Sequence, residues 1–386
     1  MIGLKGYRIV KPLVSVITPS YNQGRFIEET IESVLSQDYD NIEYIIVDGG
    51  STDNTAGIIK KYDGKLTYIT EKDNGQSDAI NKGFRMASGE IVAWLNSDDV
   101  YEPGCVSRAV EEFEKNSKLG LLYGEGYIID EKSTKIRVFE HTQEFDYWKL
   151  VNFWDYIMQP TTFFKKCYLQ QVGYLDEDLQ YCMDWDLWIK LAAVSEVKYI
   201  PDLLACSREY GETKTSTGGD KRLREIISLL QKYSGKKRPL GVESYKASTF
   251  YTKHANSIWP IKKLAGLYLT YKHKYLKKLI PQVYENGWIG KKYMLIVPGE
   301  VQQVIVRVSS PLQDTIPQYI CTYVNGVKVG EKNIYETGEN EILINIKDSR
   351  FVNEVKIVCQ NTARVKIGNK LRVSLKILNI FYEFTN

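Results

Sequence analysis

Between Pro12 and about Tyr123, short apolar runs alternate with longer amphipathic stretches, and this alternation constrains the fold more than any other feature. We expect strands buried on both faces at 13–18, 42–47, 66–70, 90–95 and 120–124. Helical spacing of apolar residues predicts helices at 25–37, 55–62, 77–87 and 104–115. Buried strands that alternate with helices predict an α/β fold with a doubly wound, mostly parallel sheet. Ligands of such sheets bind beyond the carboxyl ends of the strands.

The C-terminal part follows a different pattern. After a less regular region with a strand expected at 161–166 and a helix beginning near Asp184, apolar and polar residues alternate with a period of two at 304–310, 341–346, 354–360 and 371–378. This period is typical of strands with one buried face, and Asn325-Gly326 between two apolar runs indicates a hairpin. We expect an antiparallel β-sandwich over 291–386, after an N-terminal domain over 1–254.

The segment 255–290 between these domains is basic and aromatic. Apolar residues recur in it at helical spacing, and six lysines stand against one acid, Glu285: Lys262, Lys263, Lys272, Lys274, Lys277 and Lys278. The pattern predicts a basic, amphipathic helical linker that contacts a membrane surface peripherally. The alternative is a helix that packs on its own protein with a solvated lysine face.

Composition excludes several classes of function. A net charge of +3 gives no field that would attract nucleic acid. The three histidines lack metal-ligand spacing, and the six cysteines form no C-x-x-C pair, so we expect reduced thiols and no His-rich zinc site. No signal-peptide or membrane-spanning run is apparent, which predicts a cytoplasmic protein. The 28 Tyr and 7 Trp suit a sugar-binding cleft or a membrane interface, and they also suit core packing.

Acidic residues follow each of the strands at 42–47, 66–70 and 90–95. Clustered carboxylates repel one another unless a cation or the donors of a ligand lie among them, and oxygen ligands suit Mg²⁺ or Mn²⁺. Phosphate-binding glycine motifs are absent, so a metal would have to neutralise a pyrophosphate. The structural alternative is that Asp53 and Asp78 cap helices and that Gly49-Gly50 only turns the chain.

A set of motifs in this region resembles the ordered motifs of family 2 glycosyltransferases, which are inverting enzymes with the GT-A fold. The motifs are PSYNQG (19–24), VDGGSTDNT (47–55), EKDNGQSDAINKG (71–83), ASGEIVAWLNSDD (87–99) and YCMDWDLWIKLA (181–192). The resemblance covers about residues 12–215. It implies a GT-A domain that binds a nucleoside-diphosphate sugar.

The resemblance also implies roles for single residues. Asp98 matches the final acid of the D-x-D signature, a ligand of Mn²⁺ or Mg²⁺, whereas Asn96 replaces the commoner first Asp. Lys214 lies in a loop that closes over the pyrophosphate in relatives, where the usual histidine is missing and Tyr210 stands nearby. The residues that the resemblance assigns to nucleotide-sugar binding are Pro19, Tyr21, Asp48, Asp73, Gly75, Asp78, Asn96, Asp99, Arg208 and Lys214.

Asp184 matches the catalytic base of the family, with Met183 where Glu often stands. A carboxylate at this place would take the proton of the acceptor hydroxyl as its oxygen attacks the anomeric carbon. Helix capping is the competing role for Asp184, although Asp186 is the better candidate for it.

These observations lead to one function hypothesis and two alternatives. The first is a metal-dependent inverting glycosyltransferase that moves a sugar, from a UDP-sugar by expectation, to a glycan or lipid-linked acceptor in surface polysaccharide biosynthesis. The alternatives are a nucleotidyltransferase, for which only Gly24 and Arg25 offer a signature, and a glycan-binding protein with a degenerate transferase domain. The β-sandwich would be a carbohydrate-binding or assembly module, and homo-oligomerisation stays open.

Overall fold

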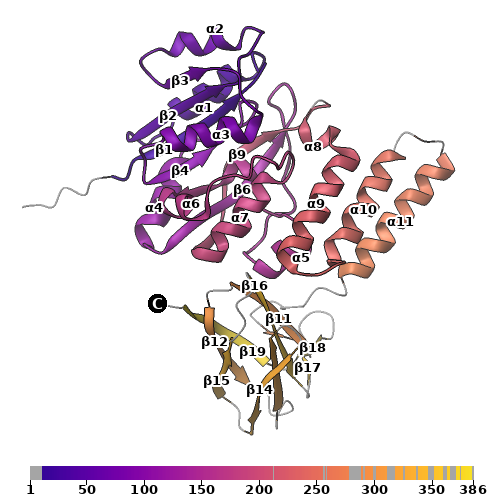
Figure 1. Cartoon of the computed structure of the whole chain (residues 1–386). Helices are drawn as coiled ribbons and strands as arrows, with labels where there is room; N and C mark the ends of the chain where they lie inside the picture. The colour runs from indigo at the N-terminus through magenta and orange to yellow at the C-terminus, as the bar shows by residue number, and fades with distance from the viewer. Residues whose placement is uncertain are drawn as a thin grey trace, which may run out of the picture. The chain divides into compact units, whose positions relative to one another are not determined.

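The computed structural model describes residues 11–211, 213–254, 257 and 259–277, and the C-terminal strands between 288 and 384. Two compact units divide these residues: the first runs to Phe145 and resumes at Asp155–Leu229, and the second comprises Asp146–Trp154 and the chain from Leu230 onward. Figure 1 labels their helices and strands. The domain limits at 254 and 290 stay a prediction.

A nine-stranded mixed sheet forms the centre of the first unit. Its strands in spatial order are β3 (Thr67–Thr70), β2 (Ile42–Asp48), β1 (Val14–Ser20), β4 (Ile91–Trp94), β8 (Phe163–Lys165), β6 (Leu119–Ile129), β9 (Glu196–Arg208) and β5 (Val100–Tyr101), with β7 (Lys135–Val138) paired to β6. The strands from β3 to β4 are parallel, whereas β8 is antiparallel to both of its neighbours. The expected α/β fold is therefore confirmed, with antiparallel strands in the second half of the sheet.

Helices cover both faces of this sheet, because β1 sends its side chains alternately to each side. On one face, Val14 and Val16 share a core with α1 (Ile27–Leu35), α2 (Thr55–Ile59) and α4 (Cys105–Lys115). On the other face, Ile17 meets α3 (Gln76–Met86), where a Cβ on Gly83 would come within 2.4 Å of its Cγ2. Figure 1 shows α3 against β1 and β2.

The face that α3 covers also receives α6 (Lys166–Val172) and α7 (Met183–Val194). Aromatic contacts join them: Phe164 of β8 lies 5.6 Å from the Phe84 ring of α3 and 5.9 Å from the Trp188 ring of α7. Trp188 also stacks on Trp94 at the end of β4. Core packing therefore brings the beginning of α7 to the strand ends that are expected to bind a ligand.

The second unit begins with the short helix α5 (Tyr147–Asn152) and includes the end of α9 (Gly219–Ser234). The helices α10 (Leu240–Lys253) and α11 (Trp259–Lys277) pack together, with Ala265 buried and an ion pair of 2.9 Å between Lys272 and Glu243. The helix expected within 255–290 is thus present over 259–277. Lys278 and Glu285 lie outside the described residues.

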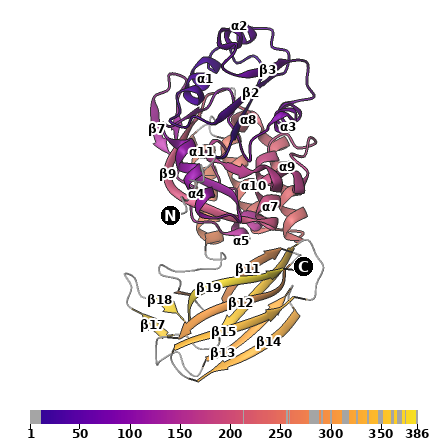
Figure 2. The same cartoon turned by 90° about the vertical axis from the view of Figure 1, so that its left-hand side faces the viewer.

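The remaining strands form the expected antiparallel β-sandwich. One sheet has the order β10 (Trp288–Ile289), β19 (Leu375–Phe384), β12 (Val301–Ser310), β15 (Gly338–Asn345); the other has β11 (Lys292–Pro298), β16 (Val352–Cys359), β13 (Gln318–Val324), β14 (Val327–Ile334). The strands β17 (Ala363–Val365) and β18 (Leu371–Val373) pair separately. Figure 2 shows the two sheets, whose inward Val306, Ile344, Ile320 and Ile357 share one core. Val324 pairs with Val327, so β13 and β14 form the expected hairpin, while the turn residues Asn325 and Gly326 lie outside the described residues.

Candidate active site

The ends of β1 and β2 form the first part of the site. Asp48, the last residue of β2, is fully buried and accepts hydrogen bonds from the Ser51 amide at 3.1 Å and the Ser51 hydroxyl at 2.5 Å. Pro19 lies in β1 opposite Val47, and Tyr21 follows with 58% of its side chain exposed. An exposed aromatic ring beside a buried carboxylate can receive the flat face of a ligand.

The loop after β3 closes against the loop after β2. A Cβ on Gly49 would lie 2.3 Å from Oδ2 of Asp73, so a larger residue at position 49 would displace this carboxylate. The other oxygen of Asp73 accepts the amide of Gly75 at 2.9 Å. Gly75 has a φ of +117°, a backbone conformation that residues with a Cβ rarely adopt. The structure therefore brings Asp48 and Asp73 together at one edge of the sheet.

Two of the predicted acids have structural partners. Asp78 accepts the Asn74 amide at 2.9 Å and pairs with Lys82 at 3.3 Å, and this backbone hydrogen bond, with Lys82, lowers the pKa of Asp78. Asp53 accepts the amides of Gly24 and Thr55, both at 3.0 Å, and so fixes the loop before α1 to the beginning of α2. Neither residue occupies the N-cap position, which belongs to Asn54 in α2 and to Gly75 in α3, so the expected capping role is wrong although both carboxylates hold loop amides.

Asn96 holds the loop after β4 through four side-chain hydrogen bonds. Its Oδ1 accepts from the Gln76 amide at 2.9 Å and the Trp94 indole at 2.8 Å. Its Nδ2 donates to Asp99 at 3.1 Å and to Gln159 at 2.9 Å. Both lone pairs and both protons of the amide are thus engaged within the protein.

Asp98 and Asp99 face different environments within this loop. Asp98 is partly exposed, and its Oδ2 accepts a hydrogen bond of 3.0 Å from the Tyr210 hydroxyl. Asp99 is buried and accepts the Arg208 amide at 2.9 Å. Burial, and then the charge of Asp98, raise the pKa of Asp99 to about 7. Asp98 is therefore the carboxylate of this pair that can meet a ligand.

The residues after β9 hold this loop from the other side. The Arg208 side chain is fully buried; it donates to the Asp98 carbonyl at 2.8 Å, the Asp130 carbonyl at 2.9 Å and the Glu29 carboxylate at 2.7 Å. The geometry thus gives Arg208 a positioning role and leaves its side chain no exposed surface for a diphosphate. Lys214, in α8 (Lys214–Thr217), is exposed and donates to Gln76 at 2.9 Å.

Asp184 is the second residue of α7. Its charge affects the pKa of a second carboxyl, that of Asp155. Asp184 is partly exposed and accepts the Trp185 amide at 2.8 Å; burial raises its pKa. Burial, and then the charge of Asp184, raise the pKa of Asp155 well above its ordinary value, while the charge of Arg222 acts on both groups in the opposite sense. Burial thus raises the pKa of both carboxyls.

Sequence patterns did not indicate Asp155, Gln159 or Arg222. Asp155 lies in the aromatic run FWDY, Gln159 lies in a short 3₁₀ helix, η2 (Gln159–Thr161), and neither follows a predicted strand. Gln76 lies within a motif that we quote, but its role as a bridge between Asn96 and Lys214 depends on the folded chain.

The donor set fits a divalent cation only together with a substrate. Among the residues described, no group of three His, Cys, Asp or Glu side chains could hold a metal ion by itself. Asp98 offers one carboxylate at the strand ends, and Mg²⁺ or Mn²⁺ is commonly held by one or two carboxylates together with phosphate oxygens and water.

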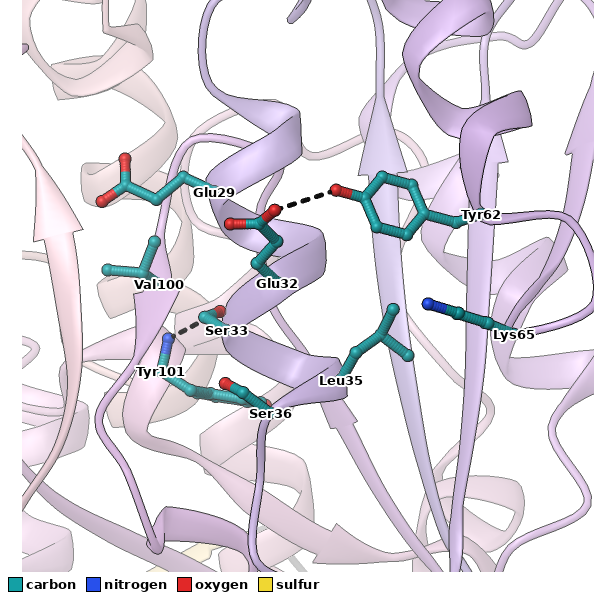
Figure 3. Close-up of a pocket in the computed structure, with 9 residues that line it drawn as sticks. All are labelled: Glu29, Glu32, Ser33, Leu35, Ser36, Tyr62, Lys65, Val100 and Tyr101. Atoms are coloured by element: carbon teal, nitrogen blue, oxygen red, sulfur yellow. Dashed lines mark hydrogen bonds between the residues drawn. The ribbon is translucent and has the colours of Figure 1, made fainter.

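A separate open groove of about 620 Å³ lies along the outer side of α1 (Figure 3). Glu29 and Glu32 of α1 line it with Tyr62, whose hydroxyl donates to Glu32 at 3.2 Å, and with Lys65 and Tyr101. Tyr62 ends the 3₁₀ helix η1 (Lys60–Tyr62). None of the predicted site residues lines this groove, so we assign it no part in the reaction.

Residues 15–171 match glycosyl transferase family 2. The chain is also 32% identical over 310 residues to an uncharacterized glycosyltransferase of Rickettsia prowazekii, and the match covers 77% of this chain and 87% of that protein. The chain belongs to glycosyltransferase family 2. It is therefore a glycosyltransferase that uses a nucleotide sugar, and the nucleotidyltransferase hypothesis is set aside.

Two further matches cover a smaller part of the chain or have lower identity. A poly-β-1,6-N-acetyl-D-glucosamine synthase of Staphylococcus epidermidis is 33% identical over 204 residues, which are 50% of this chain and 48% of that protein. The crystal structure of S. aureus TarS 1–349 with UDP-GlcNAc has a TM-score of 0.48 and 17% identity, covering 69% of this chain and 84% of that one.

Proposed function

We propose that this glycosyltransferase is an inverting, metal-dependent enzyme that transfers a sugar from a UDP-sugar to a glycan or lipid-linked acceptor in surface polysaccharide biosynthesis. Asp184 is its general base and Asp98 its metal ligand. The observation that carries the proposal is the contact between the beginning of α3 and the turn directly before α7. The Ser77 hydroxyl donates to the Leu179 carbonyl at 3.2 Å, and the charge of Lys214, which bonds Gln76, acts on Asp184.

The environment of Asp184 supports this assignment. Burial raises the pKa of its carboxyl above the ordinary value of an aspartate, and a carboxyl with a raised pKa is better suited to accept a proton near neutral pH. Asp184 takes the proton of the acceptor hydroxyl while that oxygen attacks the anomeric carbon from the side opposite the leaving diphosphate, which inverts the configuration. A bound Mg²⁺ or Mn²⁺ would supply charge stabilisation for the departing diphosphate.

Other residues bind and orient the donor in this proposal. Asp48 and Asp73 receive the nucleoside, and the exposed ring of Tyr21 covers the base. Lys214 reaches across from α8 toward the diphosphate, since its ammonium already lies at the beginning of α3. Tyr210 orients the Asp98 carboxylate, because its hydroxyl donates a hydrogen bond to one of the two carboxylate oxygens. Asn96 and Arg208 hold the loop that carries Asp98.

The test is release of nucleoside diphosphate from a panel of UDP-, GDP- and dTDP-sugars, with Mn²⁺, Mg²⁺ or EDTA. We expect turnover with a UDP-sugar and a divalent cation. Turnover only with a GDP- or dTDP-sugar would show that the proposed UDP-sugar donor is wrong. Full activity in EDTA would show that the reaction needs no metal ion.

We further propose that α11 brings the enzyme to an anionic membrane surface, where a lipid-linked acceptor would lie. Leu264, Leu267 and Tyr271 share one side of the helix and are each more than half exposed. Exposed Lys262 and Lys263 accompany them, and α11 carries no acidic residue. Each lysine near an anionic leaflet contributes about 1 kcal/mol. No helix among the described residues is long and apolar enough to cross a membrane.

Flotation with vesicles that contain anionic lipid tests this surface. We expect binding at low salt that weakens when Leu264 and Leu267 become Gln, or when Lys262 and Lys263 become Gln. A matched control replaces the exposed Val327 and Val329 of β14 with Gln. Equal binding by every variant, or no binding by the unaltered protein, would reject the membrane contact.

A further inference from the structure

We infer that Glu225 of α9 is a positioning residue for the general base Asp184, an assignment that rests on the proposed function. Glu225 lies 41 residues beyond Asp184 in the chain, on a different helix. No sequence motif that we identified includes it.

The side-chain carboxylate of Glu225 accepts hydrogen bonds from three successive backbone amides directly before α7. Its Oε1 accepts from Tyr181 and Cys182, both at 2.6 Å, and its Oε2 accepts from Gln180 at 2.9 Å. The first amides of a helix have no partner within the helix, and charged acceptors make the stronger hydrogen bonds. Negative charge is also favourable at a helix N-terminus.

The sequence at the beginning of α7 provides no such partner itself. Cys182 occupies the N-cap position and its side chain makes no capping hydrogen bond. Asp186, which we expected as a cap, is instead buried in the first turn and pairs with Lys190 at 2.9 Å. Glu225 therefore fixes, from α9, the three residues directly before α7, and the last of these lies two residues before Asp184.

Further contacts hold the same turn from both sides. The Ser77 hydroxyl of α3 bonds the Leu179 carbonyl. At the start of α9, a Cβ on Gly218 would lie 2.8 Å from Cε1 of Tyr181, so the α9 backbone comes close to the turn. Segment 179–182 is thus fixed between the donor-binding end of α3 and α9. Loss of the Glu225 contacts would let Asp184 shift relative to the donor.

The test compares Glu225→Ala and Glu225→Gln with the unaltered enzyme for kcat, for the Kd of nucleoside diphosphate and for amide hydrogen exchange at 180–182. A general base misplaced by about 1 Å costs on the order of 10²-fold in rate. We expect Glu225→Ala to lower kcat by about 10²-fold with Kd unchanged and exchange accelerated. Glu225→Gln keeps one carbonyl acceptor, so its loss of kcat should be smaller.

Glu112→Gln is the matched control. Glu112 is a buried glutamate of α4 that bonds Arg108 at 2.5 Å and also pairs with Lys115 and Lys198. Its replacement should lower the melting temperature and leave kcat within about two-fold, since a destabilised but folded enzyme keeps its active-site geometry.

The outcomes separate this inference from the proposed function. Unchanged kcat in Glu225→Ala, in an enzyme that turns over, would overturn the positioning role alone. So would equal losses of kcat and of nucleotide affinity, because they would indicate a general loss of structure. No turnover by the unaltered protein with any sugar nucleotide would overturn the proposed function and this inference with it.

Discussion

The side-chain amide of Asn96 donates a hydrogen bond of 3.1 Å to the buried carboxylate of Asp99. The second oxygen of Asp99 accepts the backbone amide of Arg208 at 2.9 Å. The residue that departs from the D-x-D pattern therefore supports the carboxylate next to the proposed metal ligand. An aspartate at position 96 could not donate this bond.

Asn96→Asp should destabilise the protein. It removes the donors to Asp99 and Gln159 and places a second carboxylate against a buried one, and an unsatisfied buried group costs about 1–3 kcal/mol. Urea unfolding at pH 7.5 measures the loss of unfolding free energy. Asn333→Asp, at an exposed position of β14, is the control for added charge. Equal urea midpoints for the Asn96 variant and the unaltered protein would show that the amide is dispensable.

The raised pKa of Asp99 predicts a pH-dependent stability. Its pKa is about 7 in the folded protein, whereas an ordinary aspartate has a pKa of about 3.9. Between these values the unfolded chain releases the proton that the folded chain keeps, so this group makes the unfolding free energy fall as pH rises. In EDTA, Asp99→Asn should flatten that fall between pH 5 and pH 7. Parallel stability profiles would contradict the assignment.

Two roles for Arg208 predict different effects of its replacement: holding the loop after β4 affects stability, whereas contacting the diphosphate affects nucleotide binding. If it holds the loop after β4, Arg208→Ala removes the donors to Glu29 and to two backbone carbonyls, and an unsatisfied buried polar group costs about 1–3 kcal/mol. Arg208→Lys should recover little, because one ammonium cannot reach all these partners. The opposite result would be an Arg208→Ala variant that unfolds at the same urea concentration as the unaltered protein but binds nucleoside diphosphate weakly. That result would support the direct contact with the diphosphate that the resemblance implies.

Asp98→Ala should remove the metal dependence of donor binding while the fold persists, because the side chain is partly exposed and its hydrogen bond to Tyr210 joins two loops only at their surface. Titration calorimetry with UDP, with and without Mn²⁺, measures this. The unaltered protein should bind UDP more tightly with Mn²⁺, and the variant should bind it equally in both conditions. A Mn²⁺ effect that survives in the variant would place the cation elsewhere.

The sequence predicts the parts of the site that depend on local pattern. Because parallel strands end at the same edge of a sheet, the positions of Asp48, Asp73 and Asp98 follow from the order of strands and helices. The partners of those residues do not, because they come from distant segments: Gln159 reaches Asn96 across 63 residues, and Arg208 reaches Glu29 across 179. An acidic residue at the end of a predicted strand can therefore be placed in the site from the sequence. Its pKa and its role depend on tertiary contacts that the sequence pattern does not show.

The same distinction applies to the fold. Apolar runs identified the parallel half of the sheet, but the expectation that the strand at 66–70 is buried on both faces was wrong: β3 lies at the edge of the sheet and is only partly buried. The antiparallel position of β8 between β4 and β6 depends on pairings such as Ala93 with Phe163, which no local pattern encodes. The segments with the clearest period-two alternation predicted the β-sandwich, because two sheets must pack together to bury the apolar faces of such strands.

The central claim is that Asp184 is the general base, and the most direct measurement is the rate of nucleoside diphosphate release by Asp184→Asn beside Asp155→Asn. Asparagine keeps the shape of either side chain but cannot take a proton. We predict that Asp184→Asn lowers kcat by about 10²–10⁴-fold with donor affinity unchanged, and that Asp155→Asn, which alters a carboxyl that takes no proton in this proposal, stays within about ten-fold of the unaltered enzyme. Normal turnover by Asp184→Asn, or a loss confined to Asp155→Asn, would contradict the account.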